Sequence, residues 1–254
     1  MLKLIPLGSG SKGNATLVRG GDTLVLVDCG FAMREIEARM ATVGYSPQDL
    51  SAVFVTHEHS DHVKGLGPFL RRHRLPVYLS HGTWHGLKDK RFEGVNCISP
   101  HQSFAVGDLQ VEPFPVPHDA REPCQYKFVH KGLRVGIMTD IGHVTPHLIA
   151  CAKACDGLLL ESNHDPQMLR DGPYPWMLQE RIRNGYGHLS NEAAAGLLGR
   201  LDLPKLQFVA LGHLSESNNT PNTAREACLI DELQLGDRLG VLAQHSVSAA
   251  LLAE

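Results

Sequence analysis

Residues 52–62 read Ala52-Val53-Phe54-Val55-Thr56-His57-Glu58-His59-Ser60-Asp61-His62, and they are the most informative segment of this 254-residue chain. The first four residues are an apolar run of β-formers, which predicts a buried strand. Apolar residues at helical spacing follow between His62 and Arg74, so the histidines lie where a strand ends and a helix begins. In α/β sheets, ligands bind beyond the carboxyl ends of the strands.

The spacing of these side chains indicates two metal ions rather than one. His57 and His59 are two residues apart, so an extended turn can aim both imidazoles at one point. Asp61 and His62 are adjacent and diverge, so they can serve a second point. Imidazole and carboxylate ligands suit zinc, manganese or iron, and the segment has no cysteine to narrow the choice. Isolated histidines are usually surface or core residues, but four ligand types packed directly after a β-run predict a metal site.

Length and composition limit the classes of protein that fit. A chain of 254 residues with 43% hydrophobic content can form one sizeable core, so we expect a single domain over residues 1–254. The net charge of −3 creates no global positive field that would recruit nucleic acid, so any such contact is local. The basic segment 71–91 is one candidate for that contact, and a solvated helix face with its loop is an equal alternative.

The sequence contains few signals that indicate a cellular compartment. The six cysteines do not form a disulfide framework or a C-x-x-C pair, and the N-terminal apolar stretch is too short for a signal peptide. No apolar run reaches membrane-spanning length. We therefore expect a cytoplasmic protein without membrane contacts.

Apolar periodicity and turn residues predict a β-rich first half and a second half that alternates helix with strand. Strands are expected at residues 3–7, 15–18, 23–27, 52–55, 76–79, 126–130, 133–139, 157–160, 206–211 and 239–244, with a strand–turn–strand unit over 104–116. Helices are expected at residues 33–43, 62–74, 145–155, 175–184, 191–201 and 221–233, with helix and loop over 82–92.

Three further metal-binding side chains stand where a predicted strand stops. His118 follows the run 112–117, Asp140 follows 135–139, and His213 follows 208–212. Each one alone is weak support for a metal site. Together with His57, His59, Asp61 and His62 they make seven candidate ligands at strand ends.

Thr56-His57-Glu58-His59-Ser60-Asp61-His62 resembles the signature of the metallo-β-lactamase superfamily. The resemblance implies an α/β fold, the αββα four-layer sandwich, in which two mixed β-sheets are flanked by helices. It also implies two divalent metal ions per chain. By resemblance, one ion is held by His57, His59 and His118, the other by Asp61, His62 and His213, and Asp140 bridges the two. Asp28, at another strand end, is expected to accept hydrogen bonds from the ligand loops.

Other motifs narrow the resemblance to one family. Gly187-His188-Leu189-Ser190 and Gly212-His213-Leu214-Ser215 repeat one tetrapeptide, and the turn Gly8–Asn14 is dense in backbone donors. With Glu161-Ser162-Asn163-His164-Asp165 they resemble the YycJ/WalJ-like nucleases, from about residue 2 to the end. The family implies 5′-to-3′ exonuclease action on DNA, in which a metal-bridging hydroxide attacks phosphorus. Ile141-Gly142-His143 departs from the family's usual Thr-Gly-Tyr, so no role is assigned to His143.

Roles in catalysis and phosphate binding follow from these motifs. Asp61 is expected to orient the hydroxide, and His188 to steady the oxyanion or protonate the leaving oxygen. Ser190 precedes a strong helix-forming run and is predicted to cap it, at a helix end suited to phosphate. The residues expected to contact substrate phosphate are Ser9, Ser11, Asn14, Ser190 and Ser215.

Other functions stay open on the sequence alone. A glyoxalase II-like thioester hydrolase shares the H-x-H-x-D-H motif. Such an enzyme would be expected to carry a helical C-terminal substrate domain, whereas this chain ends soon after its last predicted strand. An RNA-directed nuclease on the same fold is a second alternative. A non-catalytic metal-binding regulator fits less well because no ligand is missing. The native metal (zinc, manganese or iron) and the oligomeric state are left undetermined.

Overall fold

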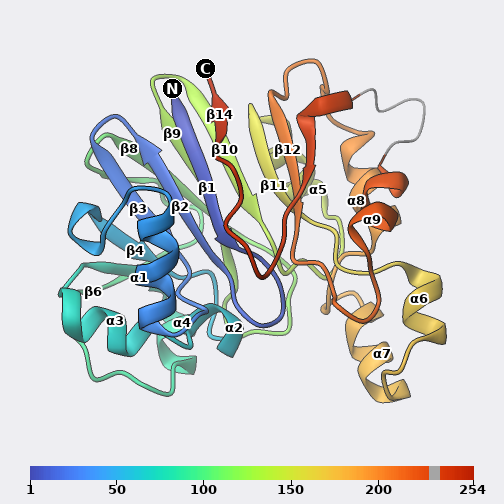
Figure 1. Ribbon diagram of the computed structural model, residues 1–254, viewed down its shortest axis with the longest axis horizontal. Coiled ribbons are helices and arrows are strands. Elements are labelled where there is room, and N and C mark those ends of the chain that lie inside the picture. The colour runs from blue at the N-terminus through green and yellow to red at the C-terminus, as the bar shows by residue number, and fades with distance from the viewer. Residues whose placement is uncertain (229–234) are drawn as a thin grey trace.

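Two seven-stranded sheets face each other in the computed structural model, which describes residues 1–228 and 235–254 (Figure 1). The first sheet has the order β14 (Leu251–Ala253), β1 (Leu2–Gly8), β2 (Ala15–Gly20), β3 (Thr23–Val27), β4 (Ala52–Phe54), β5 (Val77–Ser80) and β6 (Val95–Ile98). The second has the order β13 (Leu239–Val241), β12 (Phe208–Gly212), β11 (Gly157–Glu161), β10 (Leu133–Met138), β9 (Cys124–His130), β8 (Leu109–Pro115) and β7 (Phe104–Val106).

Both sheets are mixed, and their parallel portions bring functional residues to one edge. Strands β3 to β6 run parallel, as do β10 to β13, while the remaining neighbours are antiparallel. Parallel strands end at the same edge of a sheet, so the residues that follow β3 and β4, or β10, β11 and β12, lie together.

Helices cover the outer face of each sheet (Figure 1). The first sheet is covered by α1 (Met33–Thr42), α3 (Leu66–His73) and α4 (His81–Gly86), and the second by α5 (Pro146–Lys153), α8 (Asn191–Leu198) and α9 (Pro221–Ala227). Helices α2 (Ser60–Val63), α6 (Pro166–Asp171) and α7 (Trp176–Arg183) lie toward the opposite end of the molecule from the two termini.

Three apolar cores separate the four layers. Leu158 and Leu160 of β11 point into the core under α5, α8 and α9, whereas Leu159 between them points into the core shared by the two sheets. The third core joins the first sheet to α1 and α3. Strands buried on both faces read as continuous apolar runs, which explains the lack of alternation in Ala52-Val53-Phe54-Val55.

The predicted four-layer sandwich with two mixed sheets is confirmed. The single helix expected over 62–74 is wrong, because the chain forms α2 and α3 with a break at Gly65. A Cβ at Gly65 would lie 2.1 Å from the carbonyl oxygen of Phe31, and the Gly65 amide donates to the carbonyl of Cys29. This close packing on the loop after β3 interrupts the helix.

Other differences concern short elements. Strands β6 and β14 and helix α6 were not expected, and the strand predicted over 239–244 ends at Val241. The helix predicted over 221–233 is present as α9, and its residues 229–233 lie outside the described residues. All six cysteines are free, as expected. No helix in the described ranges is both long enough and apolar enough to cross a membrane.

Candidate metal centre

The seven predicted ligands converge at the ends of strands from both sheets. His57 and His59 follow β4, and Asp61 and His62 lie in α2 directly after them. His118, Asp140 and His213 follow β8, β10 and β12. Their ligand atoms fall into two groups, each within 4.8 Å: His57, His59 and His118, and Asp61, His62, Asp140 and His213. These are the two groups expected from the sequence.

Asp140 lies between the two groups. Its Oδ2 is 3.1 Å from Nε2 of His62, and its Oδ1 is 3.3 Å from Nε2 of His213. The same Oδ1 is 3.9 Å from Nε2 of His118 in the other group. The rings of His57 and His62 are 4.2 Å apart, so the groups adjoin. One carboxylate therefore faces both candidate cation positions.

Two buried polar atoms in this cluster lack hydrogen bonds. Nε2 of His57 and Oδ2 of Asp140 are buried without a hydrogen-bond partner, and Oδ2 contacts His62 only at ion-pair distance. A buried polar atom left without a partner is costly, and native structures contain few of them. A cation bound between a lone pair of His57 and a carboxylate oxygen of Asp140 would satisfy both atoms. The residues present thus fit divalent metal ions.

Hydrogen bonds outside the cluster orient three of the imidazoles. Nδ1 of His62 donates to Oδ2 of Asp28 over 2.8 Å, and Nδ1 of His118 donates to the carbonyl of Gly187 over 2.9 Å. Nδ1 of His213 lies 3.3 Å from Oε1 of Glu161. A proton held on Nδ1 leaves Nε2 with a lone pair toward the cluster, the tautomer that a metal ligand needs. The predicted contact of Asp28 with a ligand loop is present in this arrangement.

Carboxylates and imidazoles lie close together in the cluster and shift each other's pKa values. Burial alone would lower the pKa of His62, but the carboxylates of Asp140, Asp28 and Asp61 outweigh burial and raise that pKa well above its usual value. Burial would raise the pKa of Asp140, yet the imidazoles of His213 and His62 outweigh it and lower that pKa far below its usual value. The carboxylates therefore favour positive charge at this position, which a divalent ion supplies.

Three residues of the cluster adopt a left-handed backbone conformation. Asp28, Asp140 and His213 have φ values of 61°, 53° and 55°. Non-glycine residues are uncommon in this region, and such strained positions gather at functional sites. Asp28 and His213 directly follow a strand, and Asp140 comes two residues after the end of β10. The left-handed turn therefore aims each side chain into the cluster.

Glu161 is the functional residue that sequence reasoning missed. It ends β11, is fully buried, and its Oε1 lies 2.8 Å from Nδ1 of His188. Burial alone would raise the pKa of Glu161, but the imidazoles of His188 and His213 outweigh it and lower that pKa to about 2. The sequence signal was available: Glu161 follows an apolar strand, as Asp140 and His213 do. With them and His188 it forms a third group of potential ligands.

A cleft of about 380 Å³ opens onto the cluster. Asp61, Asp140, His188 and His213 line it, together with Ser11 and Ser215. Helix α7 and the residues just before it form one wall, with Tyr174, Leu178 and Arg181. Arg181 Nε donates to Asp119 Oδ2 over 2.5 Å, so this wall is tied to the loop that carries His118.

The other predicted phosphate contacts lie elsewhere. Ser9 is buried and its hydroxyl accepts from the amide of His213 over 2.9 Å, while Nδ2 of Asn14 lies 3.1 Å from Nε2 of His62. Ser9 therefore supports the backbone of His213, Asn14 contacts His62 on the nitrogen that faces the cluster, and neither residue lines the cleft. Ser190 caps α8 by accepting from the amide of Ala193, as predicted, and lines a neighbouring cavity.

The two-sheet sandwich and its cluster of imidazoles and carboxylates define the class. A sequence model described as the beta-lactamase superfamily domain matches residues 23–209. The chain belongs to the metallo-β-lactamase superfamily and, within it, to the family that includes the exodeoxyribonucleases WalJ and YycJ, which makes it a metal-dependent hydrolase.

The likeness extends over most of the chain. WalJ of Streptococcus pneumoniae is 34% identical over 241 residues, 92% of this chain and 89% of WalJ. YycJ of Bacillus anthracis is 37% identical over 227 residues, 86% of this chain and 84% of YycJ. The crystal structure of the metallo-β-lactamase fold protein YhfI from Bacillus subtilis matches with a TM-score of 0.72 at 16% identity, covering 98% of this chain and all of YhfI.

Proposed function

We propose that this protein is a binuclear metal-dependent phosphodiesterase, a 5′-to-3′ DNA exonuclease that acts as a single domain over residues 1–254. The observation that carries the proposal is the pair of ligand groups joined by Asp140. The family relationship supports DNA as the substrate, because both named relatives are exodeoxyribonucleases. A glyoxalase II-like thioesterase and an RNA-directed nuclease are the alternatives that the experiment below separates.

Each proposed ion would be held by one of the two groups of candidate ligands. His57, His59 and His118 would bind one, Asp61, His62 and His213 the other, and Asp140 would bind both. Zinc and manganese suit these ligands, as does iron. When bound, two divalent ions neutralise phosphate oxygens and lower the pKa of water, so that hydroxide is available near neutral pH.

His188 is placed to move the proton. Burial alone would lower the pKa of His188, but the carboxylate of Glu161 outweighs burial and raises it. A protonated imidazole beside Asp140 in the cleft is suited to donate a proton to the leaving oxygen as the bond between phosphorus and that oxygen breaks. Asp61 lines the same cleft, and its proposed role is to orient the attacking hydroxide. Glu161 holds the His188 ring in place through Nδ1.

The substrate phosphate is proposed to contact Ser11 and Ser215 directly, since both line the cleft. Ser9, Asn14 and Ser190 are proposed to act on the phosphate indirectly, by holding the loops around the cleft in place. The Ser9 hydroxyl fixes the backbone of His213, and Asn14 bonds the turn of Gly10 and reaches Asp61.

The decisive experiment is product analysis on 5′-phosphorylated DNA and RNA, single- and double-stranded, with manganese or zinc. Mononucleotides released from the 5′ end of DNA, with negligible hydrolysis of S-lactoylglutathione, are the expected result. Faster hydrolysis of the thioester would favour the glyoxalase alternative, and faster degradation of RNA the ribonuclease.

The role of His188 has its own test in His188→Ala. Metal content should stay close to that of the unaltered protein and the variant should still fold, with a lower unfolding temperature because Glu161 loses a partner. Turnover on DNA should fall by about 10²–10⁴-fold, the range of general acid catalysis. A fall of less than threefold at saturating substrate would remove His188 from the chemistry, and a loss of bound metal would make it a ligand.

A further inference from the structure

A second cavity lies on the other side of His188. It has a volume of about 400 Å³ and is lined by residues of the loop after β10, of α7 and of α8. His188 lines both this cavity and the cleft over the metal ligands. His188 is therefore the lining residue that the two hollows share, and it is the side chain that we place beside the leaving oxygen.

The charge of this cavity is positive. Arg183 and Arg200 line it with His143 and His164, and none of its lining residues in the described chain is acidic. The guanidinium of Arg200 has no hydrogen-bond or ion-pair partner among the described residues, while Arg183 pairs with Glu180, which does not line the cavity. Burial lowers the pKa of His164 to about 4, so the positive charge that does not depend on a histidine comes from the two arginines.

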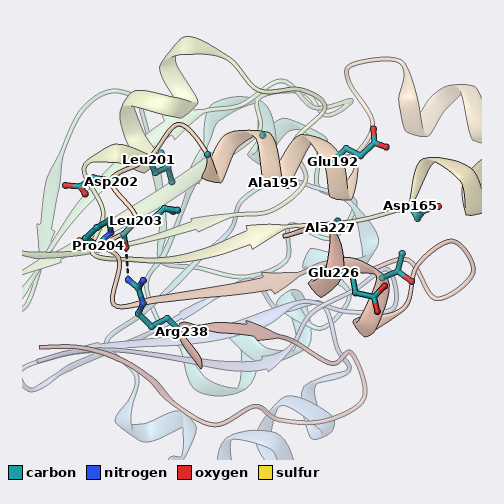
Figure 2. Close-up of a pocket in the computed structure, with 13 residues that line it drawn as sticks. Asp165, Glu192, Ala195, Leu201, Asp202, Leu203, Pro204, Glu226, Ala227 and Arg238 are labelled. Atoms are coloured by element: carbon teal, nitrogen blue, oxygen red, sulfur yellow. Dashed lines mark hydrogen bonds between the residues drawn. The ribbon is translucent and has the colours of Figure 1, made fainter. Parts of the chain in front are cut away.

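A neighbouring cavity shows the opposite character. The hollow of about 1210 Å³ between α8 and α9 contains Asp165, Glu192, Asp202 and Glu226 (Figure 2). Arg238 also lines this hollow and donates to the carbonyl of Leu203, as the dashed line in Figure 2 shows. Four carboxylates repel a phosphodiester, so the arginine-lined cavity is the one of the pair suited to a nucleotide.

The shape of the arginine-lined cavity suits one nucleotide. Val144 and Ala193, both half-buried, give it an apolar surface against which a sugar can pack, and the exposed Arg183 and Arg200 are available to a phosphate. Its volume of about 400 Å³ is at the lower end of small-molecule sites, which leaves room for one nucleotide and not for a length of strand.

We propose that this cavity binds the 5′-terminal nucleotide of the DNA substrate, with its 5′-phosphate at Arg200 and Arg183. The inference rests on the proposed exonuclease function. With the scissile phosphate in the metal cleft, the bond that breaks joins phosphorus to the 3′-oxygen of the terminal nucleotide. Hydroxide forms the new bond to phosphorus, and the 3′-oxygen takes a proton from His188, which lies between the two hollows. The nucleotide in the arginine-lined cavity is thus the leaving group.

The test compares kcat/KM on one DNA sequence carrying either a 5′-phosphate or a 5′-hydroxyl. The unaltered holoenzyme should prefer the phosphate, and Arg200→Ala should reduce that preference by about tenfold or more, the value of a charge-assisted hydrogen bond. Arg200→Lys should retain part of it. Inhibition by deoxythymidine 5′-monophosphate should weaken in parallel in Arg200→Ala. Arg34→Ala, which removes an exposed arginine of α1, is the matched control and should keep the full preference.

The outcomes separate the two levels of the proposal. If the unaltered protein degrades neither DNA, the exonuclease function fails. If it degrades DNA but Arg200→Ala keeps the preference for a 5′-phosphate, the cavity is not the terminal-nucleotide site. An equal loss on both substrates would place the body of the strand there and would also overturn the assignment.

Discussion

Glu161→Gln tests how a buried carboxylate controls the metal centre. Glu161 accepts four N–H groups: the Ile141 and Leu189 amides at Oε2, and Nδ1 of His188 and His213 at Oε1. Glutamine has nearly the same shape but only one oxygen. Its NH₂ group must therefore face two N–H donors, whichever way the side chain turns.

Of the two pairs of donors, the imidazoles are the pair that can adapt to the NH₂ group, because a backbone amide cannot release its proton. With an NH₂ group opposite, Nδ1 of each histidine becomes an acceptor and its proton moves to Nε2. For His213 this places a proton on the nitrogen that lies 3.3 Å from Oδ1 of Asp140, where a metal-binding lone pair is needed. Groups that orient metal ligands are typically worth about 10–100-fold in metal affinity. The loss of the His188 orientation adds a fall in turnover of about 10²-fold or more.

The assay measures metal per chain after dialysis against a graded chelator, and turnover on DNA at saturating manganese. Glu112→Gln is the matched control, because Glu112 forms an ion pair with Lys127 on β8 and β9, away from the metal ligands. Breaking a buried charged network costs about 3–5 kcal/mol, so unfolding is followed in the same samples. Metal affinity and turnover within twofold of the unaltered protein would refute this reasoning about tautomers.

Further outcomes follow from the same structure. Asp140→Ala should lower the metal content from two ions per chain and abolish hydrolysis, since its carboxylate faces both ligand groups; full activity would end the two-metal proposal. In chelator-treated protein, Glu161 should contribute stability that is present above pH 4.5 and lost as pH falls toward its folded pKa of about 2. Urea unfolding at pH 5 and pH 3 should show that loss in the unaltered protein and a smaller one in Glu161→Gln. Gly196→Ala should raise the melting temperature by about 2–4 °C, because a Cβ there meets nothing within 4 Å inside α8. Gly30→Ala should lower it, because its Cβ would lie 1.8 Å from the Asp61 carbonyl oxygen, and an unchanged transition would contradict that geometry.

Much of the fold was predictable because its strands are buried on both faces. Continuous apolar runs such as 52–55 and 157–160 stand out in a sequence, and the polar residues directly after them mark the strand ends. The convergence of His118, Asp140 and His213 on the H-x-H-x-D-H segment could be expected from that rule and from family resemblance. The structure brings these side chains together in two groups, with Asp140 in the group of Asp61, His62 and His213.

The residues that were missed depend on contacts between distant parts of the chain. Leu251–Ala253 become a strand only because they pair with Leu2–Leu4, and three residues carry too little periodicity to show it. Glu161 stands at a strand end as Asp140 and His213 do, but its role becomes visible only when the fold brings His188 within 2.8 Å of its carboxylate. Gly65 breaks a helical pattern because of the Phe31 carbonyl, which no local rule reveals.

The left-handed backbone of Asp28, Asp140 and His213 has a consequence for engineering. A glycine adopts this conformation freely, whereas a residue with a Cβ gives up about 1–2 kcal/mol at each such position. Glycine at these three strand ends would relieve that strain, but it would also remove a carboxylate or an imidazole from the buried pairs that link Asp28, Asp140 and His213 to the cluster. Breaking such a buried pair costs about 3–5 kcal/mol, so each glycine would lower stability as well as remove a candidate ligand or its support. A useful thermostable variant of this enzyme calls for selection on turnover and stability together.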